Sequence, residues 1–305
     1  MRILITGASG LLGLNLALEA RNFHQVVGVD RCQLTGVPFE QICADLLEQG
    51  ALDRMLDRVQ PDWLVHCAAL ASLEACEANP GLAYGLNASL PGDLAAACKV
   101  RGVKMVHIST DAVFDGTALD LYTEEDVPNP LSVYARTKLQ GEQAVLSAYP
   151  AAIVARVNFY GFSLDGKRSI AEFFINNLSM GEHIKGFTDL TFNPTFVGHL
   201  ADLLLHMLAK DLHGVYHTTS AVPMTKFAFG VALARRFGLD ESLILPDSID
   251  RSGLIARRAN NLGLSVRKLA TALGEPVPDF SSGLDRFYAQ FQQGYPQMIR
   301  SYQRV

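Results

Sequence analysis

Tyr134 and Lys138 lie four residues apart and could together handle a proton. On a helix this spacing places both side chains on one face, one turn apart. A ketone that is reduced by hydride needs a proton on its oxygen, and a tyrosine hydroxyl can donate one. Free tyrosine has a pKa of about 10, so we expect a nearby ammonium group to lower it. Alone, the pair is equally typical of a solvated helix surface.

Ser109 and Thr110 end an apolar run at residues 103–110 and offer hydroxyl groups beside such a proton donor. Ligands of open α/β sheets bind at the carboxyl ends of the strands. The Thr110 hydroxyl could hydrogen-bond the substrate carbonyl and fix its orientation. A strand-end hydroxyl followed by Tyr-x-x-x-Lys favours a reductase site over a surface pair.

A glycine-rich turn follows the first apolar run at residues 2–6 and precedes a helical pattern at 11–21. Glycines there allow a tight turn and a close approach of the helix N-terminus to a pyrophosphate. The free N–H groups and the positive helix end would bind that anion. A purely structural turn is the alternative. The residues expected to contact a dinucleotide here are Gly7, Ser9, Gly10, Leu11, Leu12 and Gly13.

Asp30 ends the second apolar run and bears on the choice of cofactor. A carboxylate there can accept both ribose hydroxyls of NAD and would repel the additional phosphate of NADP. Arg31 could instead pair with that phosphate, or could be solvated or stacked on adenine. The sequence therefore predicts NAD or NADP as the cofactor and slightly favours NAD. We expect its oxidised nicotinamide, together with the Lys138 ammonium, to lower the pKa of Tyr134.

Short apolar runs alternate with helical patterns over the first 157 residues. Their nearly continuous apolar character predicts strands buried on both faces. The alternation predicts an α/β fold with a Rossmann-type, doubly wound parallel sheet. Pro91, inside one helical pattern, predicts a kink or a later helix start. The predicted strands are 2–6, 24–30, 62–69, 103–110 and 151–157, and the helices 11–21, 51–59, 81–100 and 133–149.

The alternation ends after residue 157, and residues 158–305 read as a smaller α/β region. Helices are predicted at 199–209 and 224–238, with a strand at 214–220. We expect a domain of residues 1–157 to bind NAD(P). We expect residues 158–305 to cover its sheet edge and bind the substrate, with chain exchange between the two parts left open.

Composition excludes several classes of protein. A net charge of −5 argues against a nucleic-acid binder. No leader segment and no apolar run of about 18 residues is evident, so we expect a cytoplasmic protein that does not enter a membrane. Five cysteines without C-x-x-C spacing and eight scattered histidines predict neither a disulfide framework nor a metal site. His66 and His107 lie in apolar runs and are expected to be hydrogen-bonded core residues.

The order of these motifs resembles the extended short-chain dehydrogenase/reductase family over nearly the whole chain. The segments "STDAVFDG", "YARTKLQGE", "RVNFYG", "GVYH" and "NLGLSVRKLATALG" are most similar to the dTDP-4-dehydrorhamnose reductase branch. The resemblance implies a catalytic triad of Thr110, Tyr134 and Lys138, of which the last two also contact the cofactor. It further implies that Asp45 and Leu46 lie near adenine, that Ala68 and Ala69 line the cofactor cleft, and that Thr110 and Asp111 contact the substrate.

Some positions depart from the family pattern. Ala112 stands where dehydratases of this superfamily carry glutamate and where rhamnose-type reductases usually carry an aromatic residue. Asn15 stands where some relatives have a metal-binding glutamate, so no metal is predicted. Arg257 and Arg258 precede "ANNLGLSVRKL", and Arg258 is expected to contact a substrate diphosphate.

Three functions agree with these residues. The leading prediction is an NAD(P)-dependent reductase acting on a keto group of a nucleotide-activated deoxysugar, with Tyr134 as proton donor. The alternatives are a nucleotide-sugar epimerase with the same triad and a non-catalytic, dinucleotide-binding regulatory subunit. A homodimer formed through residues 138–149 is also expected.

Overall fold

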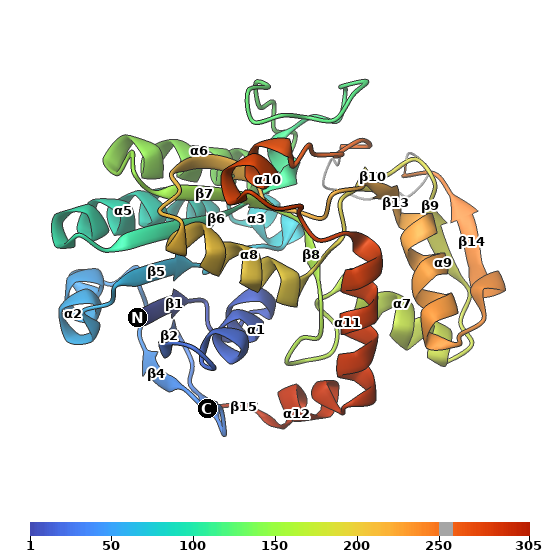
Figure 1. The fold of residues 1–305 in the computed structure, drawn as a ribbon, viewed down its shortest axis with the longest axis horizontal. Helices are drawn as coiled ribbons and strands as arrows, with labels where there is room; N and C mark the ends of the chain where they lie inside the picture. Colours follow the sequence, from blue (N-terminus) through green and yellow to red (C-terminus); the bar gives the residue numbers. More distant parts are fainter. Residues whose placement is uncertain (250–258) are drawn as a thin grey trace.

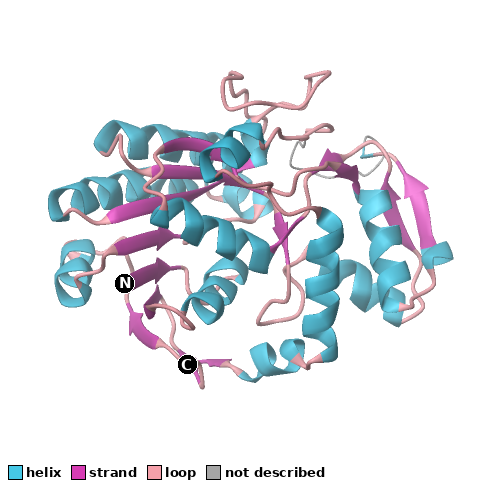
Figure 2. Ribbon diagram, viewed as in Figure 1, coloured by secondary structure: helices cyan, strands magenta, loops and turns pink. Residues whose placement is uncertain are grey.

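Seven parallel strands form one twisted sheet with helices on both faces (Figures 1 and 2). The computed structural model describes residues 1–249 and 259–305. The strand order is β12-β7-β6-β5-β1-β2-β4. The strands are β1 (Arg2–Thr6), β2 (Gln25–Asp30), β4 (Glu40–Cys43), β5 (Trp63–His66), β6 (Lys104–Thr110), β7 (Ile153–Val157) and β12 (Gly214–His217).

Helices pack on both faces of the sheet. Along β1, Ile3 and Ile5 pack into the core shared with α1 (Leu11–Ala20) and α8 (Val197–Ala209), whereas Leu4 faces the opposite core. That second core contains α2 (Ala51–Val59), α5 (Leu90–Arg101) and α6 (Val133–Ala148). Burial on both faces explains why the strands read as continuous apolar runs. The predicted α/β, doubly wound sheet is confirmed.

Pro91 lies at the second residue of α5, and the helical segment before it is irregular. α4 (Pro80–Tyr84) runs into a π-helical turn at Gly85–Ser89, which continues directly into α5. Because proline has no N–H, it cannot bond the carbonyl four residues earlier, that of Asn87. The wider π turn accommodates this missing bond, so the expected irregularity is present as a π turn. α6 packs closely here: a Cβ on Gly141 would lie 2.1 Å from the Asn87 carbonyl oxygen.

The carboxyl ends of the strands face a smaller group of elements, which lies to the right in Figure 1. There α7 packs against α9, and β9 pairs with β14. The predicted helix at 224–238 is present as α9 and ends at Gly238, which has a positive φ of 67°. The elements of this group are α7 (Ile170–Ser179), β9 (Ile184–Phe187), β10 (Thr191–Phe192), β13 (Met224–Thr225), α9 (Lys226–Phe237), η3 (Glu241–Leu243) and β14 (Ile244–Asp247).

Several segments after residue 157 return to the large sheet. The strand predicted at 214–220 is β12, which pairs with β7, and α8 packs on α1. At the other edge, β15 (Gln303–Arg304) pairs with β3 (Leu34–Thr35), and Figure 1 shows the C-terminus beside β4. The chain therefore crosses the predicted boundary at residue 157 more than once, and the division into 1–157 and 158–305 stays a prediction.

The remaining elements are short or connect these two parts. None of the helices in the described ranges is long and apolar enough to cross a membrane. The elements are α3 (Leu73–Ala78), η2 (Asp111–Val113), β8 (Phe159–Tyr160), β11 (Thr195–Phe196), α10 (Arg267–Leu273), α11 (Phe280–Gln292) and α12 (Tyr295–Ser301).

Candidate active site

The glycine turn between β1 and α1 packs closely against neighbouring backbone. Gly7 has a φ of 67°, and a Cβ there would lie 2.7 Å from the Ala68 backbone nitrogen. A Cβ on Gly13 would lie 2.2 Å from the Gly7 carbonyl oxygen. Gly10 caps α1 with an extended backbone and no side-chain hydrogen bond. The first N–H groups of α1 are thus available to an anion.

A cavity of about 460 Å³ opens beside this turn, at the carboxyl ends of β1, β2 and β5. Its wall contains nine of the predicted cofactor residues: Gly7, Ser9, Gly10, Asp30, Arg31, Asp45, Leu46, Ala68 and Ala69. Leu11, Leu12 and Gly13 form the first turn of α1 next to it. The structure therefore brings together segments 7–10, 30–31, 45–46 and 68–69 at one opening large enough for part of a dinucleotide.

Asp30 is held in place at the end of β2 by the backbone. Its two carboxylate oxygens accept N–H bonds from Ser9 at 2.9 Å and from Arg31 at 2.8 Å. The cavity wall also contains two arginines that sequence reasoning missed, Arg168 and Arg304. Arg304 arrives on β15, which is paired to β3. Positive charge thus reaches this cavity from segments far from Asp30 in the sequence.

A second cavity, of about 300 Å³, contains the predicted proton donor. Tyr134 lies in the first turn of α6, and Thr110 ends β6. Both line this cavity together with Asp111 and with Ala112, the residue that departs from the family pattern. Ala71 lines it two residues after Ala69, which lines the cofactor cavity, so the two cavities are neighbours.

Lys138 lies one turn after Tyr134, and its side chain points into the protein. Its Nζ donates to the Ile108 carbonyl at 2.6 Å and lies 3.3 Å from Nε2 of His107. Burial lowers the pKa of Lys138 to about 8, although the nearby Glu142 carboxylate acts to raise it. The Lys138 cation is therefore buried beside β6 and is not among the described residues that line the two cavities.

Tyr134 does not show the lowered pKa that the sequence led us to expect. Burial raises its pKa to about 12, and a hydrogen bond with Thr110 only partly opposes this. In this structure Lys138 bonds the Ile108 carbonyl, and the nearby Asp111 and Cys76 raise the pKa of Tyr134 further. Lowering by Lys138 together with bound nicotinamide stays a prediction.

The predicted substrate residues are only partly placed. Asp111 is buried, accepts from Asn158 Nδ2 at 2.6 Å, and has a pKa raised chiefly by burial. Asn158 and Lys226 also line the Tyr134 cavity and were missed as site residues, although Asn158 lies within the quoted segment "RVNFYG". Arg258, like Arg257, lies outside the described residues.

His66 and His107 are buried, as predicted, and lie behind Lys138. The two rings stack at 5.4 Å, and Nδ1 of His66 lies 2.7 Å from the Thr6 hydroxyl. Burial lowers the pKa of His66 to about 3 and holds that of His107 well below its ordinary value. Over the described ranges, no group of three or more acidic, histidine or cysteine side chains could hold a metal ion.

A glycine turn at a helix N-terminus, an acidic residue ending β2, and Thr110 and Tyr134 in one cavity at the sheet edge form the arrangement that the sequence predicts for an extended short-chain dehydrogenase/reductase. The family model "RmlD substrate binding domain" matches residues 1–293, and the chain belongs to that family.

The comparisons include relatives of similar length. The chain is 32% identical over 297 residues to the probable low-salt glycan biosynthesis reductase Agl14 of Haloferax volcanii, covering 95% of this chain and 98% of the relative. It is 32% identical to dTDP-4-dehydrorhamnose reductase of Mycobacterium tuberculosis, covering 93% and 91%. It is also 33% identical to methionine adenosyltransferase 2 subunit beta of Mus musculus, covering 93% and 86%.

Solved structures match the whole fold. The dTDP-4-dehydrorhamnose reductase of Bacillus anthracis, in complex with NADP, superposes with a TM-score of 0.86 at 25% identity, covering 95% of this chain and 99% of that one. The dTDP-4-dehydrorhamnose reductase orthologue of Clostridium acetobutylicum superposes with a TM-score of 0.83 at 27% identity, covering 96% of this chain and 100% of that one.

Proposed function

We propose that this protein is an NAD(P)-dependent reductase that converts a keto group of a nucleotide-activated deoxysugar to a hydroxyl. The observation that carries the proposal is that Tyr134 and Thr110 share a cavity next to the dinucleotide cavity, with Lys138 one turn behind. Relatives named dTDP-4-dehydrorhamnose reductase support the sugar class.

In the proposed reaction the chain positions the carbonyl and supplies the proton. The Thr110 hydroxyl would hydrogen-bond the substrate oxygen, and Tyr134 would donate its phenolic proton to that oxygen. The raised pKa keeps Tyr134 protonated at neutral pH, which a proton donor requires. The bound reduced nicotinamide would supply the hydride. The Lys138 ammonium would then stabilise the phenolate left behind.

For the cofactor, we propose that both NADH and NADPH bind. Asp30 suits the ribose hydroxyls of NAD, as the sequence predicts, while Arg31 and Arg304 offer positive charge to an additional phosphate in the same cavity. The slight preference for NAD, the cytoplasmic location and the homodimer through residues 138–149 stay predictions.

The test is reduction of dTDP-4-keto-6-deoxy-L-mannose, followed by NADH and NADPH absorbance, in wild type beside Tyr134→Phe. We expect turnover in the wild type, a loss of at least about 100-fold in kcat in the variant, and unchanged cofactor affinity. Equal turnover by the two proteins would show that Tyr134 is not the proton donor.

Two alternatives remain as outcomes of the same experiment. An epimerase would retain its dinucleotide through purification and would not consume added NADH. A regulatory subunit is supported by the 33% identity to methionine adenosyltransferase 2 subunit beta. That function predicts dinucleotide binding without turnover, and effects on a partner enzyme that Tyr134→Phe leaves intact.

A further inference from the structure

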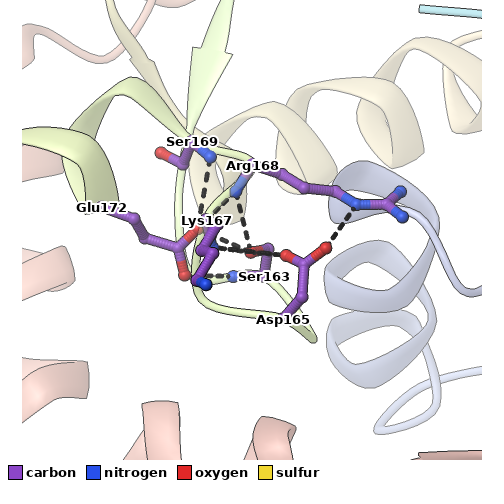
Figure 3. A network of polar contacts seen from close by, with 6 residues as sticks. All are labelled: Ser163, Asp165, Lys167, Arg168, Ser169 and Glu172. Carbon is purple, nitrogen blue, oxygen red and sulfur yellow. Dashed lines mark hydrogen bonds and ion pairs between the residues drawn. The ribbon is translucent and has the colours of Figure 1, made fainter. Parts of the chain in front are cut away.

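Arg168 lines the dinucleotide cavity from the second part of the chain, in the same wall as Gly7, Ser9 and Gly10. It belongs to a loop of residues 162–169, which leads into α7. Figure 3 shows its side chain extending away from this loop toward a neighbouring helix in the blue of the first residues. The position is separated from the glycine turn by more than 150 residues of sequence.

The loop is held by a buried carboxylate rather than left to move. Glu172, in the first turn of α7, is 1% exposed and forms a capping box with Ser169. The Ser163 hydroxyl donates to Glu172 Oε2 at 2.6 Å. The backbone N–H groups that also donate to Glu172 are those of Ser163 at 2.8 Å, Arg168 at 3.2 Å and Ser169 at 3.2 Å (Figure 3).

Further bonds tie both ends of the loop to its surroundings. Asn15, on α1, donates from Nδ2 to the Phe162 carbonyl at 3.0 Å, which fixes the loop against the helix that follows the glycine turn. Asn176 donates to the Gly166 carbonyl at 2.8 Å, and Gly166 has a φ of 69°, which suits glycine. The backbone that carries Arg168 is therefore preorganised relative to α1.

One neighbouring carboxylate orients the Arg168 side chain without occupying its two η nitrogens. Its Nε donates to Asp165 Oδ2 at 3.0 Å. In the part of the chain that the structure describes, its two η nitrogens make no hydrogen bond. A guanidinium with one nitrogen anchored and two free presents a planar pair of donors, a geometry that matches phosphate oxygens.

We propose that Arg168 binds the diphosphate of the dinucleotide; this inference rests on the proposed function. Arg31 follows the end of β2, and Arg304 lies on β15, which pairs with β3. Both are therefore expected near the adenosine ribose of the dinucleotide. The loop that carries Arg168 is held on α1 by the bond from Asn15 to the Phe162 carbonyl, and Arg168 lines the same cavity wall as the glycine turn. The second part of the chain thus supplies a cofactor contact absent from the glycine motif.

The test measures dissociation constants of NADH, NADPH and ADP-ribose for wild type, Arg168→Gln and Lys167→Gln by calorimetry. Lys167 is the matched control, because it is an exposed cation on the same loop that does not line the cavity. We expect Arg168→Gln to weaken all three ligands about 10-fold and by the same factor, because all share the diphosphate. Lys167→Gln should stay within about 2-fold of wild type.

Other outcomes overturn the inference. Unchanged affinity in Arg168→Gln, or a loss confined to NADPH, would show that Arg168 does not bind the diphosphate. Should Arg168→Gln fold poorly by circular dichroism, Arg168→Lys, which keeps the charge without the fork, must still bind more weakly than wild type. A wild type that binds no dinucleotide would defeat the proposed function itself, whereas binding unaffected by Arg168 defeats this inference alone.

Discussion

Replacing Arg156 by methionine should destabilise the fold strongly, because Arg156 forms a buried ion pair directly behind the site. Arg156 on β7 and Glu142 on α6 have side chains 5% and 3% exposed, and their Nη2 and Oε2 atoms lie 2.8 Å apart. A second bond joins Arg156 Nε to Oε1 at 3.0 Å, and the Ser109 hydroxyl donates to that oxygen at 2.5 Å. Glu142 lies one turn after Lys138 on the same helix.

The magnitude follows from what the substitution leaves behind. Methionine fills much of the volume of Arg156 but abandons a buried carboxylate, and breaking such a pair costs about 3–5 kcal/mol. We would measure the free energy of unfolding by urea titration. Arg235→Met removes an arginine from an exposed pair with Glu241, so it should cause little or no change.

A double variant separates charge from packing. Arg156→Met combined with Glu142→Leu removes both charges, so it should be more stable than Arg156→Met alone. If Arg156→Met unfolds at the same urea concentration as Arg235→Met, the reasoning from burial is wrong. If the double variant is the least stable protein, lost packing rather than the unpaired charge explains the effect.

The remaining predictions concern two buried groups that titrate, Lys138 and His66, and one cation, Lys226, that lines the cavity containing Tyr134. Lys138 has a pKa of about 8 in the fold, below its ordinary value of 10.5, so the unfolded chain binds more protons between these values. Stability should therefore rise from pH 8 to pH 10 by about 2 kcal/mol relative to Lys138→Met, and parallel unfolding curves would contradict this. Because the pKa of His66 is about 3 in the fold, the free energy of unfolding should fall by about 2 kcal/mol between neutral pH and pH 5. The loss should be smaller in His66→Gln, as measured by urea titration at each pH. Lys226→Gln should raise KM for an anionic nucleotide sugar about 10-fold while leaving the NADH dissociation constant unchanged, and a change in the latter alone would refute its placement.

The fold could be predicted because each strand is buried on both faces. The runs at 2–6, 103–110 and 151–157 each contain three or more apolar residues and are buried at nearly every position, and each forms a strand of the large sheet. The membership of β12 in that sheet was not evident, because a four-residue strand carries no information about its partner. The outcome at Pro91 was predicted only as an irregularity, since a proline removes a hydrogen bond without specifying how the helix adapts.

The candidate site was predictable where its residues follow one another along a motif. Gly7, Gly10 and Asp30 are brought together by the strand and turn that they occupy. Arg168 and Arg304 could not be predicted, because their places depend on a loop anchored by Glu172 and on a two-residue strand at the end of the chain. Nothing in their local sequence distinguishes them from surface arginines.

The buried polar groups around Lys138 explain how one positive charge is held beside β6, the strand that ends at Thr110. His107 offers Nε2 as an acceptor to the Lys138 ammonium, and burial together with that ammonium keeps His107 neutral. Thr6 in turn bonds His66, and its hydroxyl also accepts the N–H of Ala68, which lines the cofactor cavity. Because both histidines are neutral, Lys138 is the charged member of the group that it forms with His107 and His66. The glycine turn, the wall of the cofactor cavity and Lys138 are thus linked through Thr6, His66 and His107, whose polar side chains lie on β1, β5 and β6. Within this group burial leaves the two imidazoles neutral and Lys138 as the cation.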